Sequence, residues 1–399
     1  MDQAVPLIEL ANRAEATFQE RFGRTANSLV AAPGRVNLIG EHTDYNNGFV
    51  LPMAINRYTV IAADVADGQV ARVYSALIDE QQEIPLPSGE VASGEVEALP
   101  EWTRYIRGVF DAYHEAGISP LAFDAVVDST VPVGGGLSSS ASLEVATATL
   151  IETLTGQSVT PVRKALLCQL AEHRGAGVPC GIMDQFSSVL CQAGHLMLLD
   201  CRSQETKMVR LADPAIEVLI INSNVKHELT GGEYAERRAQ CYAAAKALGV
   251  SSLRDASMAM LGEQKANLNE ILYRRARHVI GEIERTTAAA TALEAGQWDE
   301  VGRLMFCSHA SLRDDFEVSC GELDILVAAA SELGTEQGVV GSRMTGGGFG
   351  GCTVSLVKAD SAGDVAEEIC RRYHKQTGVE ATSFATPPAQ GATVLSQPG

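Results

Sequence analysis

The chain has 399 residues, more than the roughly 250 to 300 at which one hydrophobic core stops growing, so two domains with a cleft between them are expected. Its composition, 46% hydrophobic and 20% charged, is that of a globular protein and excludes disordered, collagenous and membrane-embedded classes. With a net charge of −19 the chain repels phosphate backbones and anionic lipid, so nucleic acid and membrane surfaces are poor partners.

The nine cysteines and the N-terminal segment indicate the compartment. The cysteines are odd in number and form no C-x-x-C pair, so reduced thiols are expected. The first residues include Asp2, Glu9 and Glu15 and lack both the basic start and the apolar core of a signal peptide. No run of 18 apolar residues occurs. We therefore expect a soluble cytoplasmic protein, and no feature of the sequence indicates an obligate protein partner.

The first half is predicted to be a sheet covered by helices. Apolar residues at helical spacing predict an opening helix from Leu7 to Phe22, with Gly23 as its C′ residue. Runs rich in β-branched residues predict strands at 30–38, 58–65, 70–77 and 123–131. Helical periodicity follows at 139–154 and 162–173.

The second half is predicted to mix helices and strands. The polar segment 202–204 predicts a connection, so we expect one domain at 1–202 and another at 203–399. Strands are predicted at 195–199, 218–222 and 352–357, and helices at 232–248 and 265–297. The final dozen residues, which follow Pro387 and contain Pro388 and Pro398, are expected to fray.

The densest polar segment lies between Pro33 and Pro52 and reads G-R-V-N-L-I-G-E-H-T-D-Y-N-N-G at its centre. It crowds Glu41, His42 and Asp44 into one turn, between apolar residues that anchor it. Carboxylates beside an imidazole suit hydrogen bonding to a polyol. The alternative is an ordinary solvated loop with a capping Asp, because loops are polar in general.

A second segment, 131–142, reads V-P-V-G-G-G-L-S-S-S-A-S and links a predicted strand to a predicted helix. Glycines let the backbone approach a phosphate, a helix N-terminus attracts anions, and hydroxyls can bind phosphate or Mg²⁺. The segment is therefore typical of an anion cradle. It lacks the lysine of a Walker loop, and a capped turn of structural purpose is the alternative.

A third segment, 344–352, reads M-T-G-G-G-F-G-G-C and formally contains G-x-G-x-x-G. The predicted strand follows the glycines, whereas a dinucleotide-binding turn needs a strand before them and a helix after them. No H-R-D or D-F-G occurs, which excludes a protein-kinase loop. A tight structural turn is the alternative here. The three segments together suggest an ATP-dependent enzyme.

These segments resemble the three signature motifs of the GHMP kinases, and the first resembles the galactokinase family in particular. The resemblance spans nearly the whole chain. It implies an α+β, two-domain GHMP kinase fold, with a ribosomal-protein-S5-domain-2-like N-terminal domain and a ferredoxin-like C-terminal domain. It also implies transfer of the γ-phosphoryl group of MgATP to the anomeric hydroxyl of α-D-galactose, giving galactose 1-phosphate and ADP in the Leloir pathway.

The resemblance further implies roles for individual residues. Asp184, in C-G-I-M-D-Q, is implied to be the catalytic base, and Arg35 to keep it ionised and to stabilise transition-state charge. The implied sugar ligands are Glu41, His42, Thr43, Asp44, Gly181 and Tyr234. The implied nucleotide contacts are Ser75, Pro132, Val133, Gly134, Gly135, Gly136, Leu137 and Ser138.

The implied cofactors are ATP and Mg²⁺, with Ser138 and Glu172 as the metal ligands, since few oxygen ligands suit Mg²⁺. Each assignment has a structural alternative. Glu172 would be a surface residue near a helix end, Arg35 a sheet-edge ion pair, Asp184 a helix cap and Tyr234 a packing residue. His and Cys residues show no zinc-binding spacing.

Two other functions stay open at this point. A GHMP kinase for another acceptor, such as N-acetylgalactosamine, mevalonate or homoserine, would share the nucleotide motifs, although residues 46–49 look more like the galactokinase family. A galactose sensor without catalytic activity would lack residues of the serine-rich loop, which is complete at 138–141. The sequence does not indicate oligomeric state, the order of substrate binding or tolerance for 2-deoxy and 2-amino sugars.

Overall fold

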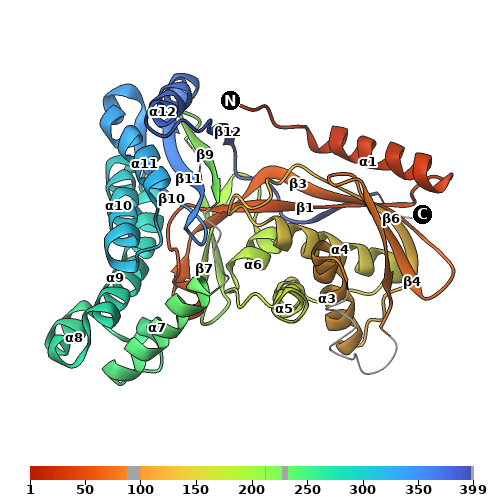
Figure 1. The fold of residues 1–399 in the computed structure, drawn as a ribbon, viewed down its shortest axis with the longest axis horizontal. Coiled ribbons are helices and arrows are strands. Elements are labelled where there is room, and N and C mark those ends of the chain that lie inside the picture. Colours follow the sequence, from red (N-terminus) through yellow and green to blue (C-terminus); the bar gives the residue numbers. More distant parts are fainter. Residues whose placement is uncertain (88–98, 212, 227–231, 397–399) are drawn as a thin grey trace.

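The computed structural model describes residues 1–87, 99–211, 213–226 and 232–396. It is elongated, with a sheet-rich part at one end and a stack of long helices at the other (Figure 1). The largest sheet has six strands in the order β13-β1-β3-β6-β4-β5. Its strands are β1 (Ser28–Asn37), β3 (Pro52–Val65), β4 (Val70–Ser75), β5 (Glu80–Pro85), β6 (Phe123–Ser129) and β13 (Thr393–Ser396).

Helices cover both faces of this sheet. The helix α1 (Leu7–Phe22) lies on one face, and four helices lie on the other (Figure 1). These four are α3 (Glu101–Glu115), α4 (Ser139–Thr155), α5 (Pro161–Ala171) and α6 (Met183–Leu190). Successive residues of β1 enter different cores, with Leu29 in the cluster under α1 and Val30 in the cluster under α3 and α4. Burial on both faces explains the continuous apolar run of this strand.

The loop between β1 and the next strand, residues 38–48, carries Glu41, His42 and Asp44 and is called the sugar loop below. A small sheet in the order β2-β7-β8 follows it and spans the expected domain boundary. Its strands are β2 (Phe49–Val50), β7 (His195–Asp200) and β8 (Thr206–Arg210). Residue 203 lies in the turn between β7 and β8. The polar segment at 202–204 is therefore the turn of a hairpin.

The second half contains a four-stranded sheet in the order β10-β11-β9-β12 with long helices packed beside it. Its strands are β9 (Ile216–Lys226), β10 (Val339–Met344), β11 (Gly350–Lys358) and β12 (Thr382–Thr386). Its helices are α7 (Glu233–Leu248), α8 (Met258–Glu263), α9 (Glu270–Glu294), α10 (Trp298–Ser311), α11 (Gly321–Leu333) and α12 (Ala362–Thr377). None of the helices in the described ranges is long and apolar enough to cross a membrane.

Most predicted elements are confirmed. The opening helix ends at Phe22, and Gly23 takes a left-handed C-cap with φ 69°. The helix predicted from residue 265 begins at Glu270 instead, because the Asn269 side chain accepts a hydrogen bond from the Leu272 N–H and caps it there. The sequence patterns did not predict the helices α3, α6, α8, α10, α11 and α12 or the strands β2, β5, β8, β10, β12 and β13.

The expectation that the final dozen residues fray is wrong up to residue 396. Strand β13 pairs with the edge of β1, where Leu29 lies opposite Ser396. An unpaired sheet edge offers backbone partners, and this pairing outweighs the prolines nearby. Residues 397–399 lie outside the described residues. The other end of the chain lies far away, where the Asp2 N–H donates to the Ser383 carbonyl oxygen of β12 (2.7 Å).

Candidate active site

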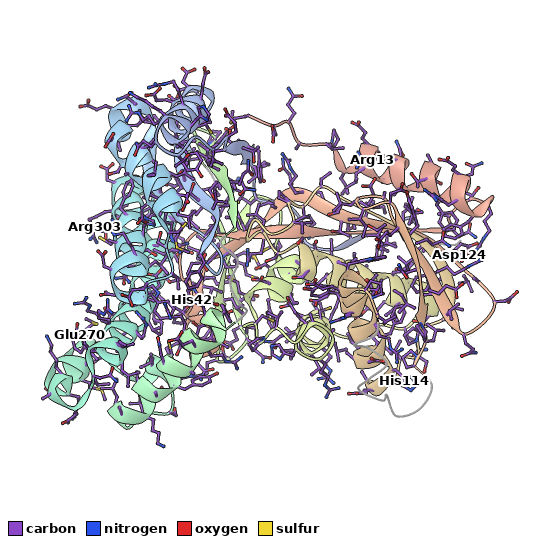
Figure 2. All side chains as sticks on the ribbon, in the orientation of Figure 1. Arg13, His42, His114, Asp124, Glu270 and Arg303 are labelled. Atoms are coloured by element: carbon purple, nitrogen blue, oxygen red, sulfur yellow. The ribbon has the colours of Figure 1, made fainter. Side chains whose placement is uncertain are left out.

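A cavity of about 170 Å³ lies where the segment after β1, the segment before α6 and the turn after β10 meet. Side chains from both halves of the chain line it. Figure 2 shows His42 where the stack of long helices meets the sheet-rich part of the molecule. The lining residues are Arg35, Glu41, His42, Asp44, Glu172, Val178, Cys180, Gly181, Met183, Asp184, Tyr234, Gly346 and Gly347.

The loop between β1 and β2 is shaped by its own backbone. Gly40 has φ 105°, and a Cβ there would lie 2.7 Å from the Phe49 carbonyl oxygen. The buried Thr43 hydroxyl lies 2.9 Å from the Gly40 carbonyl oxygen and 2.6 Å from that of Phe49. His42 adopts φ 63°, a left-handed value that points its ring into the cavity region. Thr43 thus braces the loop and does not line the cavity.

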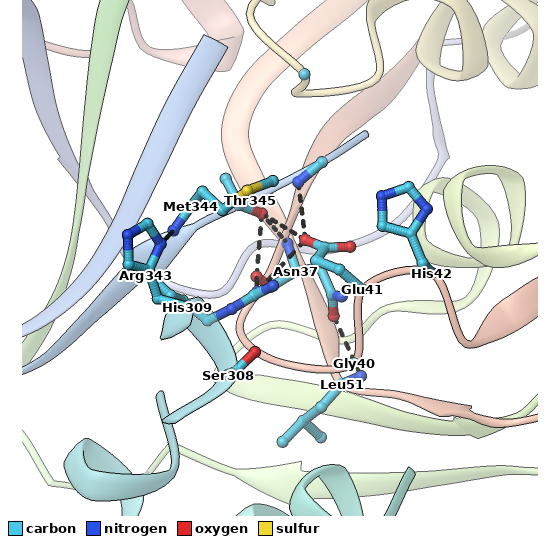
Figure 3. A network of polar contacts seen from close by, with 12 residues as sticks. Asn37, Gly40, Glu41, His42, Leu51, Ser308, His309, Arg343, Met344 and Thr345 are labelled. Carbon is cyan, nitrogen blue, oxygen red and sulfur yellow. Dashed lines mark hydrogen bonds and ion pairs between the residues drawn. The ribbon is translucent and has the colours of Figure 1, made fainter. Parts of the chain in front are cut away.

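Glu41 is buried and held on one carboxylate oxygen (Figure 3). Its Oε1 accepts from the Gly346 N–H (2.7 Å) and the Thr345 hydroxyl (3.1 Å). The same oxygen lies 3.4 Å from Arg343 Nη1. The segment after β10, more than 300 residues away in the chain, therefore orients this carboxylate toward the cavity.

Asp44 and His42 have strongly shifted protonation. Burial, followed by the charge of Asp184, raises the pKa of Asp44 to about 6. Burial lowers the pKa of His42 to about 3, so the ring is neutral at pH 7 and can both donate and accept. Its Nδ1 lies 2.8 Å from the Tyr45 hydroxyl oxygen. Its Nε2 lies 3.2 Å from the Gly347 carbonyl oxygen, so both ring nitrogens have a protein partner.

Gly181 and Tyr234 complete this side of the cavity. A Cβ on Gly181 would lie 1.6 Å from Asp44 Oδ2, so only glycine leaves room for that carboxylate. The ring of Tyr234, on α7, lies 5.6 Å from the His42 ring and 5.5 Å from the Tyr45 ring. Every implied sugar ligand except Thr43 therefore lines the cavity.

Asp184 lies in the first turn of α6 and contacts two groups from elsewhere in the chain. Arg35 Nε donates to its Oδ1 (2.8 Å), and Arg35 Nη2 lies 2.7 Å from the same oxygen. The Ser138 hydroxyl donates to Asp184 Oδ2. Burial disfavours the Arg35 charge, but the carboxylates of Asp184 and Glu41 outweigh burial and raise the pKa of Arg35. The ion pair of Arg35 and Asp184 thus lies between the cavity and the glycine turn, residues 132–138.

The glycine turn connects β6 to α4. Gly134, Gly136 and Ser138 have φ values of 75°, 73° and 62°, which curl the backbone immediately before the helix N-terminus. Ser138 stands at the N-cap without capping the helix by its side chain, because its hydroxyl is directed at Asp184. Val133, at the tip, is 71% exposed. The turn leaves its backbone accessible beside the carboxylate, as a phosphate cradle requires.

Ser75 lies close to the base of this turn. It is the last residue of β4 and pairs with Val127 of β6, the strand that leads into the turn. Pro132, Gly135 and Leu137 complete the implied nucleotide loop, and the Leu137 carbonyl oxygen accepts from the Arg35 N–H (3.1 Å). The structure therefore brings all the implied nucleotide residues to one end of the sheet.

The chain is similar to known proteins along nearly its whole length. Three family models match the chain: the galactokinase galactose-binding signature over residues 16–65, the GHMP kinase N-terminal domain over 104–192 and the GHMP kinase C-terminal domain over 289–375. Human galactokinase is 49% identical over 98% of this chain and 97% of its own length. The chain belongs to the galactokinase family of GHMP kinases.

Solved structures agree with this membership. A crystal structure of Lactococcus lactis galactokinase complexed with galactose has a TM-score of 0.89 and 33% identity, covering 95% of this chain and 98% of that one. Mevalonate kinase from Methanococcus jannaschii has a TM-score of 0.60 at 17% identity, covering 92% of this chain and 99% of that one, which shows a shared fold. The two-domain GHMP kinase fold is thus confirmed, and the chain is an ATP-dependent sugar kinase by family.

In this member of the galactokinase family, Glu172 lies in a short π-helix (Glu172–Ala176) that continues α5. Its Oε1 accepts from the Ser140 hydroxyl (3.0 Å), and its Oε2 accepts from the Gln185 amide. Gln185 also donates to the buried Glu144 (2.9 Å). Burial, followed by the charge of Asp184, raises the pKa of Glu172. Glu172 is therefore a buried cavity residue.

The oxygen atoms here fit a Mg²⁺ ion. The carboxylate of Glu172 and the hydroxyls of Ser138 and Ser140 lie beside Asp184, and few protein oxygens with open positions suit an ion that keeps water and phosphate oxygens in its shell. Within the described ranges, no group of three or more His, Cys, Asp or Glu residues forms an all-protein metal cage. In this structure Ser138 contacts Asp184, and it is Ser140 that contacts Glu172.

The third glycine segment forms the turn between β10 and β11 and lies against the other two. A Cβ on Gly346 would lie 3.0 Å from the Gly136 carbonyl oxygen, and one on Gly351 would lie 3.0 Å from that of Gly135. It is thus a tight turn that touches the nucleotide loop and, through the Gly346 N–H, the sugar loop.

Sequence reasoning missed Arg343, Ser140, Gln185 and Glu144. Ser140 sits inside the serine run and could have been included with Ser138. The other three carry no local signal, because their positions depend on contacts between residues distant in the chain.

Proposed function

We propose that this chain transfers the γ-phosphoryl group of MgATP to the anomeric hydroxyl of α-D-galactose, giving galactose 1-phosphate and ADP. One observation carries the proposal: Asp184 accepts from Arg35 on one oxygen and from Ser138 on the other, between the sugar-loop cavity and the glycine turn. A base placed between the acceptor and the nucleotide suits phosphoryl transfer, in which positioning supplies most of the catalysis.

Galactose would bind in the cavity between the sugar loop, Gly181 and Tyr234. Glu41 and Asp44 supply hydrogen-bond acceptors, and the neutral His42 ring lines the cavity beside them with its nitrogens on the Tyr45 hydroxyl and the Gly347 carbonyl oxygen. The Tyr234 ring closes the side formed by the second half of the chain. The Lactococcus lactis relative was crystallised with galactose, which supports this choice of sugar.

Asp184 would take the proton of the anomeric hydroxyl as that oxygen attacks the γ-phosphorus. Arg35 holds this carboxylate in place, because its Nε and Nη2 both contact Asp184 Oδ1. The same guanidinium stabilises negative charge that develops on the transferred group. Arg35 also donates to the Gly136 carbonyl oxygen (2.5 Å), which fixes it relative to the nucleotide turn.

The nucleotide phosphates would bind at residues 132–138 and the α4 N-terminus, with Ser75 near the base of the turn. Glu172 and Ser138 would hold Mg²⁺, with Ser140 beside them. When bound, the ion neutralises charge on the β- and γ-phosphate oxygens. The protein's own part is to align these phosphates with Asp184 by backbone N–H groups and hydroxyls.

We propose residues 1–202 as the half that carries the sugar loop, the nucleotide turn and the base, and residues 203–399 as the half that carries Tyr234 and the third glycine segment. Strand β13 returns from the second half to the first sheet. The small-molecule partners are galactose and ATP, without nucleic acid, membrane or obligate protein partner, and the location is cytoplasmic, as fits an ATP-dependent sugar kinase.

A coupled assay of ADP release tests the function with galactose, glucose, N-acetylgalactosamine, mevalonate and homoserine as acceptors. We expect ADP release to require galactose and Mg²⁺, with product identified as the 1-phosphate by ³¹P NMR. Preference for another acceptor would overturn the choice of substrate. Galactose binding without ADP release would instead support a sensor.

A further inference from the structure

Arg343, the residue before the last of β10, is wholly buried and has few partners (Figure 3). Its Nη1 donates to the Asn37 carbonyl oxygen (3.1 Å) and lies 3.4 Å from Glu41 Oε1. Its Nε and Nη2 have no hydrogen-bond partner among the described residues. The buried carboxylate of Glu282 also interacts electrostatically with Arg343, but a guanidinium with two unpaired nitrogens is an expensive group to bury.

Stability does not account for such a residue. Replacing a buried ion pair by packed apolar side chains is often neutral or stabilising, so a buried pair is weak evidence for a stabilising role. Val354 of β11 lies opposite Arg343 and is apolar and buried, whereas Ser342 and Ser355 nearby are buried and polar. The position of the charge directly behind Glu41 needs another reason.

The three groups that donate to Glu41 differ in charge and in how fully their hydrogen is available. The Thr345 hydroxyl has one hydrogen, which it shares between Glu41 Oε1 and the Asn37 carbonyl oxygen (both 3.1 Å). The Gly346 N–H is neutral. Arg343 is the cation of this group. All three contact Oε1, which leaves Oε2 for the cavity that Glu41 lines.

We propose that Arg343 is a positioning residue for galactose, which holds the Glu41 carboxylate turned toward the cavity from the other half of the chain. This inference rests on the proposed function, because it assumes that Glu41 accepts a hydrogen bond from a sugar hydroxyl. Arg343 itself does not line the cavity and does not touch the sugar.

A second buried group holds the same loop. Glu282 of α9 is wholly buried, accepts from the Gly40 N–H (3.0 Å) and pairs with Arg285 (2.7 Å). Residues 40 and 41 are thus fastened to the second half of the chain through two separate charged side chains. The sugar loop is therefore also held by contacts from the half that does not contain it.

Steady-state kinetics on Arg343→Met test the inference. We expect the KM for galactose to rise about tenfold or more, with the KM for ATP and kcat each within about twofold, because loss of a ground-state contact that persists in the transition state changes KM alone. Arg343→Lys keeps the charge in the same place and is expected to recover part of the loss. A merely structural residue would not produce this separation.

A double mutant tests whether Arg343 acts through Glu41. In a Glu41→Gln background, the further change Arg343→Met is expected to alter the KM for galactose less than about twofold, since coupled residues are not additive. The matched control is Arg107→Met, which removes another buried arginine, paired with Asp111 (2.9 Å) on α3. We expect Arg107→Met to leave both KM values unchanged.

Several outcomes would overturn the inference. These are equal effects of Arg343→Met on both KM values, an unchanged KM for galactose, or full additivity with Glu41→Gln. If Arg343→Met does not fold, Thr345→Val removes another donor to the same oxygen and is expected to raise the KM for galactose alone, by a smaller factor. Failure of the proposed function would appear separately, as a wild-type protein without galactose-dependent ADP release.

Discussion

The glycine turn before α4 and the glycine turn between β10 and β11 have similar compositions and different surroundings. In the first, Gly134 and Gly136 are exposed, and the neighbouring Val133 is 71% exposed. In the second, Gly346 and Gly351 are buried, and the Gly346 N–H is already donated to Glu41. The first turn exposes Gly134 and Gly136, whereas the second, apart from the exposed Gly347, uses most of its backbone inside the protein.

This difference shows that glycine serves two physical purposes here. In the turn before α4, positive φ values curl the chain so that several N–H groups and a helix N-terminus face outward. In the turn after β10, the missing Cβ lets backbones approach closely, and a Cβ on Gly348 would lie 2.2 Å from the Val318 carbonyl oxygen. Glycine content alone does not distinguish a turn that can bind a ligand from a turn that packs closely against neighbouring backbone.

The largest expected effect lies where the open turn meets the chemistry, at Asp184. Asp184→Asn removes the proposed base, and we expect kcat to fall by ~10²–10⁴ because a positioned base typically contributes that factor. Calorimetry is expected to show galactose binding largely retained. Asp111→Asn, which also removes a carboxylate paired with arginine, is the control and should keep its kcat. A near-wild-type kcat for Asp184→Asn would remove this residue from the role.

The next effect separates the sugar loop from both glycine turns. Glu41→Ala and Asp44→Ala each remove a charged hydrogen-bond acceptor, a contact worth about 1.5–3 kcal/mol, so the KM for galactose should rise roughly 10–100-fold. Gly181→Ala should act in the same direction, because its methyl group would displace the Asp44 carboxylate. The KM for ATP is the internal control, and equal changes in both KM values would mean that the loop is misassigned.

A third experiment contrasts the two turns directly through stability. Gly348 has φ 89°, and its Cβ would collide with a backbone oxygen, so Gly348→Ala should lower the free energy of unfolding by roughly 1–3 kcal/mol. Gly135→Ala, in the first turn, lacks a positive φ and would meet its nearest atoms at 3.5 Å, an ordinary contact. Urea denaturation should therefore show almost no change for Gly135→Ala. Equal losses would mean that both turns are braces.

The smallest expected effect is a pH dependence of sugar binding. The pKa of Asp44 is raised to about 6 from its ordinary 3.8, so the carboxylate gains a proton as the pH falls through about 6 and becomes a weaker, uncharged hydrogen-bond acceptor. The KM for galactose should therefore rise several-fold between pH 7 and pH 5. Asp44→Asn, which cannot titrate, should abolish this change. A wild-type KM that is flat over this range would contradict the assignment.

The same raised pKa has a defined sign for stability. A carboxyl whose pKa is higher in the folded state binds its proton more tightly there, so it favours folding at low pH. Its contribution is lost as the pH rises from about 4 to about 6. Asp44→Asn should therefore gain stability relative to the wild type above pH 6, in the absence of galactose.

Local patterns predicted what local interactions determine. The helix α1 follows its apolar spacing and ends at Gly23, and α4 begins directly after the serine-rich turn. The family resemblance, and not periodicity, implied that Arg35 acts on Asp184, and the two side chains form an ion pair in the structure. Strong local signals and a distinctive motif were enough for these parts of the fold and of the site.

Long-range contacts determine what the sequence did not indicate. The burial of Arg343 depends on Asn37 and Glu41, about 300 residues away, and nothing near it in sequence distinguishes it from a surface arginine. Thr43 has the same polar character as its neighbours, but its hydroxyl is needed by two loop carbonyl oxygens. The pairing of β13 with β1 likewise requires a partner from the far end of the chain.

Each end of the chain packs against the half that does not contain it, so the two halves cannot be separated without loss of contacts. The first residues are hydrogen-bonded to β12, while the last strand completes the sheet that begins with β1. Cutting at residue 203 would give two fragments that each lack an edge segment supplied by the other. The halves are therefore interlocked, and a split into separate pieces would leave unpaired the backbone groups that these contacts join in the intact chain.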